Sequence, residues 1–239
     1  MLTQKLFNEV STIWEAYLSH PFITGLADGT LPKEKFKYYM VQDYLYLYEY
    51  AKVFALGAVK TDDHDLMRFF SGLMDGTLNG EMLIHKAYMK RLDITDEDVN
   101  NARQALSNNA YTSYMLRIAY EGDALDILIA VLACSWSYAY IGTKLAENKS
   151  ALAHPFYGEW IEGYSCDDYV NSNEALMNRI NELGKNISEK RLARLKEIFI
   201  NCSRFEAMFW DMAWQGDCAL CSDKADKQLL SEEAADASF

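Results

Sequence analysis

The sequence predicts an all-α protein that forms one bundle-like domain. Apolar residues recur with a helical period along most of the 239 residues, and no segment sustains the period of two that is typical of a half-buried strand. The chain has only three prolines and lacks the regularly spaced turn clusters of a β-sandwich. Half of its residues are hydrophobic, which is enough to bury a sizeable core.

Helix start and stop signals divide the chain into its expected elements. Residues 20–32 contain two prolines and two glycines and are expected to form a loop. The helix after them begins with Pro32, which suits a first turn, and runs for about eight turns. The expected helices are 4–18, 32–61, 62–92, a short one from 95, 110–120, 123–148, 155–165, 167–183 and one from 188 to about 214.

Several residues are expected to shape particular helices. Gly72, Gly76 and Gly80 should loosen the helix over 62–92. The sequence TDED at 95–98 is a capping box for the short helix that follows it. Three further helix starts are expected, one at Asn108 or Asn109, one at Asp123 and one at Ser188. Gly184 is expected to end a helix.

The charge balance argues against two classes of partner. The chain has 35 acidic and 23 basic residues, a formal net charge of −12, which disfavours binding to nucleic acid or to anionic membranes. No apolar run is expected to reach the ~20 residues of a membrane span. The N-terminus is amphipathic rather than signal-like, so we expect a soluble, cytoplasmic protein.

The five cysteines favour reduced thiols over disulfides, because their number is odd and their spacing fits no disulfide framework. Cys218 and Cys221 form one C-x-x-C motif, but no further zinc ligands lie near it in sequence. We therefore expect one helical domain over residues 1–215 and an acidic, partly disordered tail over residues 216–239.

Polar residues in the apolar stripes of the long helices mark a candidate site. Asp43 and Glu206 interrupt otherwise apolar stripes, and Cys134 and Tyr138 fall on the inner face of the helix over 123–148. A buried carboxylate without compensation costs several kcal/mol. Either each acid hydrogen-bonds an internal tyrosine or tryptophan, or both point into one cavity beside the thiol; the two interpretations remain open at this stage.

Histidines offer weaker candidates. Glu81 and His85 lie one turn apart and could bind a metal, but a di-iron bundle needs more histidines than the four available, so a hydrogen-bonded interior pair is favoured. His20 could ligate haem, although a loop histidine at a helix end is the simpler interpretation. His64, which stands among aspartates, fits a solvated helix start.

Four sequence blocks resemble the TenA family, also called thiaminase II. They read HPFITGLADGTLPKEKFKYYMVQDYLYL, AYTSYMLRIAYEGDALDILIAVLACSWSYAYIG, HPFYGEWIEGYS and FEAMFWDMAW, in the order and spacing of that family. The likeness extends over nearly all of residues 5–215. It implies a single-domain, haem-oxygenase-like helical bundle that assembles as a homotetramer.

The resemblance also implies an activity. TenA-like enzymes hydrolyse 4-amino-5-aminomethyl-2-methylpyrimidine to its 5-hydroxymethyl counterpart in thiamin salvage, and many cleave thiamin, without a metal or other cofactor. By motif, Cys134 corresponds to the nucleophile and Glu206 to the catalytic acid or base. The implied substrate-binding residues are Asp43, Tyr46, Tyr111, Tyr138, Tyr164 and Phe209.

These residue types suit that chemistry. A carboxylate such as Asp43 can form two parallel hydrogen bonds with the amidine edge of an aminopyrimidine. Glu206, with a pKa raised by apolar neighbours, can hold the proton that activates the ring, and Cys134 can add to the ring covalently. The competing hypotheses are a non-enzymatic regulatory helical protein, a metal-dependent oxidase on the same bundle and a haem-degrading enzyme.

Overall fold

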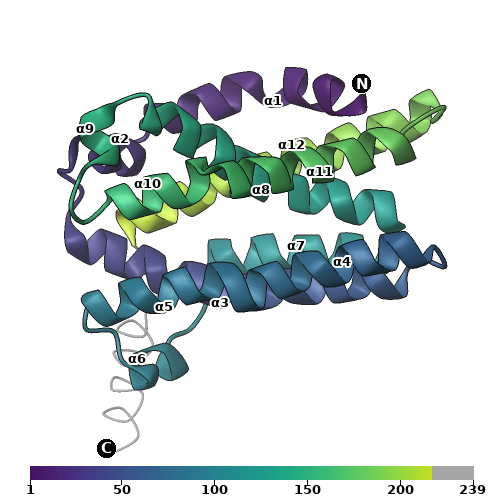
Figure 1. Ribbon diagram of the computed structural model, residues 1–239. Helices are drawn as coiled ribbons and strands as arrows, with labels where there is room; N and C mark the ends of the chain where they lie inside the picture. Colours follow the sequence, from purple (N-terminus) through teal and green to yellow (C-terminus); the bar gives the residue numbers. More distant parts are fainter. Residues whose placement is uncertain (217–239) are drawn as a thin grey trace, which may run out of the picture.

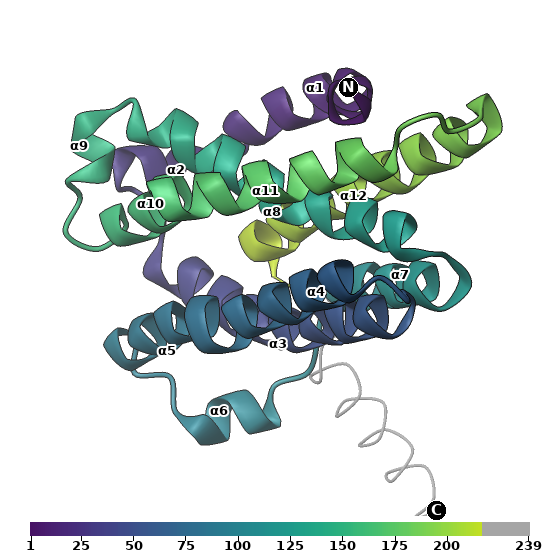
Figure 2. The same ribbon diagram turned by 45° about the vertical axis from the view of Figure 1, so that its right-hand side comes forward.

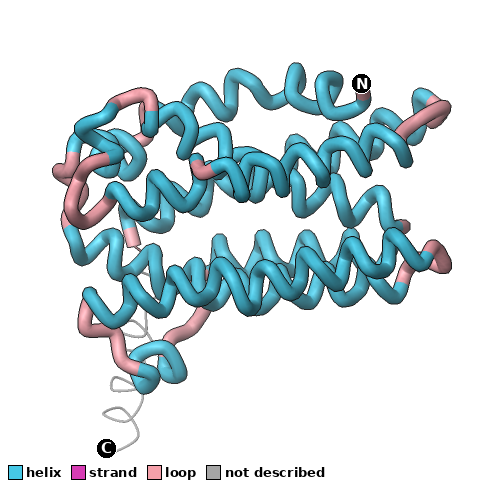
Figure 3. The backbone as a smooth tube through the Cα atoms, in the orientation of Figure 1, coloured by secondary structure: helices cyan, strands magenta, loops and turns pink. Residues whose placement is uncertain are grey.

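The computed structural model describes residues 1–216, and these residues form helices without any strand, as predicted (Figures 1 and 3). The elements are α1 (Leu2–Leu18), α2 (Pro21–Asp28), α3 (Lys33–Val59), α4 (His64–Gly76), the π-helix η1 (Thr77–Glu81), α5 (Met82–Arg91), α6 (Asp96–Asn101), α7 (Leu106–Glu121), α8 (Ala124–Ala146), α9 (Lys149–Leu152), α10 (Gly158–Ser165), α11 (Asp167–Leu183) and α12 (Glu189–Gln215).

The long helices form two layers (Figures 1 and 2). One layer holds α3, α4, α5 and α7, with the short α6 at its edge, and the other holds α1, α2 and α8–α12. Within the second layer, α8 packs against α10, α11 and α12. Both α8 and α12 also contact α3 and α7, so they join the layers and bring their inner faces against α3.

Side-chain caps explain where several helices begin. Capping boxes formed by Thr95 with Asp98 and by Asp123 with Asp126 start α6 and α8. The Ser188 hydroxyl accepts a backbone hydrogen bond at the start of α12. The predicted helix starts at Thr95, Asp123 and Ser188 are confirmed.

The prediction of a loop over residues 20–32 is wrong, because most of this segment forms α2. Pro21 occupies the first helical position, where its missing N–H and fixed φ cost nothing. The His20 ring accepts a hydrogen bond from the backbone N–H of Phe22 and so caps the helix, and Gly29 ends it with a left-handed φ of 77°. The proline and glycine that indicated a loop are therefore the two ends of a short helix. The short α9 was not expected either.

Asn108 and Asn109 do not cap α7, contrary to the prediction. The helix begins at Leu106, and Asn108 lies inside it, fully buried. The Asn108 side-chain amide donates to the backbone carbonyl of Gln42 at 2.8 Å, and Gln42 Oε1 accepts from the N–H of Ala105 at 2.9 Å. These amides join the start of α7 to α3.

The region 62–92 is not one regular helix. α4 ends at Gly76, the five residues Thr77–Glu81 form a π-helix, and α5 follows. The glycines were expected to loosen this region, and the wide turn occurs among them. A π-helical turn changes the direction in which the neighbouring side chains point, and such turns occur frequently at functional sites. Here it places Glu81 at the boundary of α5.

The expectation that no apolar run reaches the length of a membrane span is wrong for α8. Its 23 residues are long and apolar enough by composition, and 72% of its most apolar window is buried inside the fold. A helix that is packed on all sides has no solvated face that would call for polar residues, so its composition approaches that of a membrane helix. The burial indicates that α8 is the central core helix.

The predicted tail over 216–239, with Cys218 and Cys221, lies outside the described residues except for Gly216.

Candidate functional site

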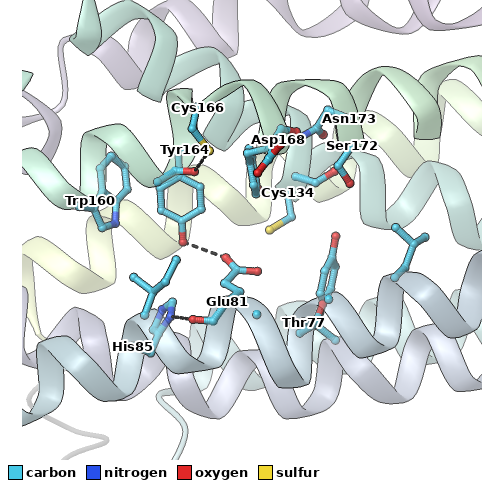
Figure 4. Close-up of a pocket in the computed structure, with 18 of the residues that line it drawn as sticks. Thr77, Glu81, His85, Cys134, Trp160, Tyr164, Cys166, Asp168, Ser172 and Asn173 are labelled. Carbon is cyan, nitrogen blue, oxygen red and sulfur yellow. Dashed lines mark hydrogen bonds between the residues drawn. The ribbon is translucent and has the colours of Figure 1, made fainter.

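A cavity of about 510 Å³ lies between the two layers. Its walls come from α3, α4, η1 and α5 on one side and from α8, α10 and α11 on the other. Figure 4 shows Glu81 and His85 facing Trp160 and Tyr164 across it. The volume is in the range of small-molecule sites, and aromatic side chains form much of the wall.

The thiol of Cys134 lies on the wall of this cavity, near its centre (Figure 4). The side chain is half-buried, whereas the residues immediately before it on α8 are fully buried. Burial raises the pKa of the Cys134 thiol well above its usual value, and the charge of Glu206 raises it further. Hydrogen bonding to Tyr46 acts in the opposite direction. The thiol is therefore protonated at neutral pH.

Glu206 on α12 is buried directly behind Cys134, with 2% of its surface exposed. Tyr111 on α7 donates its hydroxyl to Glu206 Oε1 at 2.8 Å. Burial raises the pKa of Glu206 to about 8, although hydrogen bonds from Tyr111 and Cys134 lower it in part. No cation contacts this carboxyl among the described residues, so it is mostly protonated at pH 7.

Asp43 on α3 is paired with His85 on α5. Asp43 Oδ2 and His85 Nε2 lie 2.6 Å apart, and both side chains are buried. Burial works to lower the pKa of His85, but the hydrogen bond and charge of Asp43 outweigh it and raise that pKa. His85 Nδ1 lies 3.0 Å from the backbone carbonyl of Glu81, which fixes the ring. Asp43 and His85 therefore form a buried hydrogen-bonded pair that joins α3 to α5.

Glu81 and His85 do not bind each other through their side chains. Instead the Tyr164 hydroxyl on α10 donates to Glu81 Oε1 at 2.8 Å. Burial raises the pKa of Glu81, and the charge of Asp43 also raises it. Among residues 1–216 no group of three or more His, Cys, Asp or Glu side chains is arranged to hold a metal ion. The predicted hydrogen bond between Glu81 and His85 is thus made through the Glu81 backbone carbonyl, while their side chains pair with Tyr164 and Asp43.

The other two histidine interpretations are settled by their contacts. His20 caps α2, and its Nε2 lies 3.4 Å from Asp211, so it has the helix-end role expected of it. His64 is exposed at the start of α4, as expected.

The nominated aromatic residues surround the acids and the thiol. The ring of Tyr46 lies 5.4 Å from that of Tyr111 and 5.7 Å from that of Phe209. Tyr138 lies 4.8 Å from Tyr164, measured between ring centroids. Of the eight nominated residues, Cys134 and Tyr164 line the cavity, and the other six are buried behind its wall.

Sequence reasoning favoured Glu81 and His85 as a hydrogen-bonded interior pair that could tune the site and did not nominate either as a substrate-binding residue, although the structure places both on the cavity wall. The available signal was their four-residue spacing beside Gly80, but the π-turn changes which neighbour each residue meets. The stripes on α3, α8 and α12 nominated Asp43, Cys134 and Glu206, and the structure brings these three close enough for the carboxyl charges to affect the thiol.

Comparison with known proteins gives consistent results. A model of the TENA/THI-4/PQQC family matches residues 7–216. A protein of Halalkalibacterium halodurans named aminopyrimidine aminohydrolase is 47% identical over 87% of this chain and 93% of its own length.

Solved structures show the same arrangement of helices. A TenA homologue from P. horikoshii OT3 superposes with a TM-score of 0.83 at 35% identity, over 90% of this chain and 99% of the homologue. A domain from Shewanella denitrificans described as having a heme oxygenase-like fold superposes with a TM-score of 0.73 at 21% identity, over 89% and 92% of the two chains. The predicted haem-oxygenase-like fold is confirmed.

Proposed function

This chain belongs to the TENA/THI-4/PQQC family, and on that premise we propose that it is an aminopyrimidine hydrolase that breaks a C–N bond by covalent catalysis at Cys134. Its substrates are 4-amino-5-aminomethyl-2-methylpyrimidine, in thiamin salvage, and thiamin. The observation that carries the proposal is a thiol on a cavity wall beside a buried, uncharged carboxyl. The name of the relative from Halalkalibacterium halodurans supports the substrate class.

Asp43 binds the pyrimidine in this proposal. An ionised carboxylate pairs with an amidine edge through two parallel hydrogen bonds when the ring nitrogen of that edge carries a proton. A carboxylate has about four acceptor positions, so Asp43 can keep its bond to His85 and still accept from the substrate. His85 orients the Asp43 carboxylate, and Asp43 in turn favours the protonated, activated ring.

Glu206 supplies the proton for a second ring nitrogen. Its carboxyl is mostly neutral at pH 7, because its pKa is about 8. As it donates to the ring, its carboxylate accepts the proton of the Cys134 thiol, and the sulfur forms a bond to a ring carbon. A free thiolate is never needed, which is consistent with the raised pKa of the thiol. The role of Glu206 is thus that of a proton relay between sulfur and ring.

The adduct then loses its amine. Electrons from the ring expel ammonia from the protonated aminomethyl group, or neutral thiazole from thiamin, so the C–N bond breaks and an exocyclic double bond forms. Water adds its hydroxyl to the methylene carbon, and the water proton goes to ammonia or, when thiazole has left, to bulk solvent. The bond between sulfur and carbon breaks, the ring becomes aromatic again and Cys134 regains its proton. The net reaction exchanges an amine for a hydroxyl.

The test is a parallel assay of both substrates with Cys134→Ser. We expect turnover to fall about a thousandfold or more, while product affinity stays within about tenfold, or ~1.4 kcal/mol. Cys166→Ser is the matched control, because Cys166 also lines the cavity but its thiol donates to the Gly163 carbonyl. Retained activity in Cys134→Ser would contradict covalent catalysis.

The homotetramer and the cytoplasmic location stay predictions from the resemblance and the sequence. Light scattering of the purified chain, whose monomer mass is 27.4 kDa, tests the first.

A further inference from the structure

One end of the cavity lies between two walls. The first is formed by α4 and η1, and the second by α11. In Figure 4, Thr77, Ser172 and Asn173 lie on one side of Cys134, and Trp160 and His85 lie on the other. Gly72, Gly76, Thr77, Ser172, Asn173 and Leu176 line this end, which we call the α4–α11 compartment. None of these residues belongs to the pyrimidine site described above.

Glycines keep this part of the cavity open. A Cβ added at Gly72 or Gly76 would meet no atom within 4 Å, and neither residue has a positive φ. Packing and backbone conformation would therefore permit alanine, which stabilises a helix interior by roughly 1 kcal/mol relative to glycine. Both glycines line the cavity, one helical turn apart. Both glycines are exposed, so a large side chain at either position would narrow this end of the cavity without meeting the fold.

Asn173 brings an unused acceptor to the compartment. The side chain is 4% exposed, and its Nδ2 donates to the Tyr169 carbonyl at 3.0 Å. Its Oδ1 has no hydrogen-bond partner among the described residues. A buried carbonyl without a donor costs about 1–3 kcal/mol. A ligand with a hydroxyl group can supply the missing donor after a small rotation of the amide, whereas a ligand that carries only acceptors cannot.

The charges around the cavity favour a cation. No lysine or arginine lines it, and its one basic side chain, His85, is paired with Asp43 and lies on the side of Cys134 away from Ser172 and Asn173 (Figure 4). Its acids are Glu81, Asp168 at the exposed surface of α11, and Glu159, whose carboxylate pairs with Arg91 at 2.6 Å. A positively charged ring is attracted to this wall, and a phosphate group is repelled by it.

We propose that the α4–α11 compartment binds the leaving group of the larger substrate, a cationic thiazole ring with a free hydroxyl, and rejects the phosphorylated form. This inference rests on the proposed function, because it assigns a second part of the same site. The pyrimidine occupies the side of Asp43, the bond to be broken lies at Cys134, and the thiazolium half of thiamin extends toward Gly72. Its hydroxyethyl group donates to Asn173 Oδ1. The aminomethylpyrimidine, which releases only ammonia, does not use the compartment.

The test compares three substrates, aminomethylpyrimidine, thiamin and thiamin monophosphate, in wild type and in Gly72→Leu. For wild type we expect kcat/KM to be about tenfold or more higher for thiamin than for its monophosphate. Gly72→Leu should lower kcat/KM for thiamin by about tenfold or more and that for aminomethylpyrimidine by less than about threefold. Ser71→Leu is the matched control, because Ser71 is the neighbouring exposed residue of α4 and does not line the cavity.

An equal loss for both substrates in Gly72→Leu, or equal rates with thiamin and its monophosphate, would overturn this inference and leave the proposed function standing. A wild type that hydrolyses only aminomethylpyrimidine would overturn it together with the thiamin part of the proposed function. Binding provides a readout that does not depend on turnover. In the Cys134→Ser background, Gly72→Leu should weaken thiamin binding about tenfold, and Ser71→Leu should not. If the double variant with Cys134→Ser and Gly72→Leu binds thiamin as tightly as Cys134→Ser alone, the compartment does not bind the thiazolium half of thiamin.

Discussion

Two carboxyls in this protein are equally buried, and their surroundings differ completely. Asp126 in the first turn of α8 and Glu206 in the middle of α12 are each 2% exposed. Asp126 Oδ1 accepts from Arg191 at 2.8 Å and from Arg194 at 3.2 Å. Its Oδ2 accepts from the backbone N–H of Asp123 in the capping box. Asp126 therefore has two cations and a helix N-terminus to stabilise its charge.

Glu206 has none of these. Its hydrogen-bonding partners are the phenol of Tyr111 and the thiol of Cys134. The charge that acts on its pKa is that of Asp43, which is negative. Burial therefore raises its pKa to about 8. A buried acid that only supported the fold would be expected to have cations beside it, as Asp126 has. The difference teaches that the partners of a buried acid, rather than its burial, separate a structural role from a role in proton transfer.

The largest expected effect tests Glu206 as a proton relay. Glu206→Gln keeps the shape and can still accept from Tyr111, but it cannot donate a proton to the ring or accept one from Cys134. We expect kcat to fall about a thousandfold, or ~4 kcal/mol, with a much smaller change in KM. Steady-state kinetics of the purified variant measures both. A fall confined to KM would place Glu206 in binding instead.

The reverse result is expected for Asp126→Asn. The variant leaves Arg191 and Arg194 without their shared anion, so we expect the free energy of unfolding to fall by about 3 kcal/mol. The kcat of the folded fraction should stay near that of wild type, because Asp126 does not line the cavity. Urea unfolding and kinetics on the same sample measure the two quantities. A loss of kcat without a loss of stability would break the comparison.

Asp43 is the intermediate case, since it is buried and paired with one titratable cation, His85. Asp43→Ala removes the proposed anchor of the pyrimidine, and we expect KM to rise about thirtyfold, or ~2 kcal/mol. An unchanged KM with full activity would remove Asp43 from the site. His85→Gln should raise KM less, because the carboxylate remains and loses only the side chain that orients it.

The pH dependence of stability tests the raised pKa of Glu206 without an activity assay. The pKa of Glu206 is about 8 in the folded protein and lies near 4.5 in the unfolded chain. The folded state therefore holds one more proton between these values, and stability falls as the pH rises through them. From pH 5.5 to 7 the contribution of Glu206 should fall by about 2 kcal/mol. His85 and Glu81 also have raised pKa values, so the decisive quantity is wild type minus Glu206→Gln. A difference that stays constant over this range would show that the pKa of Glu206 is normal.

Sequence periodicity predicted the helical fold and nominated Asp43 and Glu206 because each interrupts an apolar stripe. It did not nominate Asp126, although Asp126 is as deeply buried. An acid in the first turn of a helix looks ordinary, because such acids cap the helix and favour its dipole. A stripe shows that a residue faces inward, but it does not show which other helix supplies the partner.

The same limit explains the missed site residues. His85 meets Asp43 across forty-two positions of sequence, and Glu81 meets Tyr164 across eighty-three. The π-helix Thr77–Glu81 adds a local reason, because its wider turn breaks the 3.6-residue count on which the expected pairing of Glu81 with His85 depended. Helix caps were more predictable, since both members of a capping box lie within four residues.

The smallest expected effect concerns Arg194, the weaker of the two cations at Asp126. Its side chain is 43% exposed, and its Nε lies 3.2 Å from Asp126 Oδ1. Because Arg194 is well solvated and Asp126 Oδ1 still accepts from Arg191, Arg194→Gln should lower the free energy of unfolding by only about 0.5 kcal/mol. Urea unfolding beside Asp126→Asn provides the comparison. If Arg194→Gln cost as much as Asp126→Asn, the charge of Asp126 would depend on a single cation, and its contrast with Glu206 would rest on one ion pair rather than on a compensated cluster.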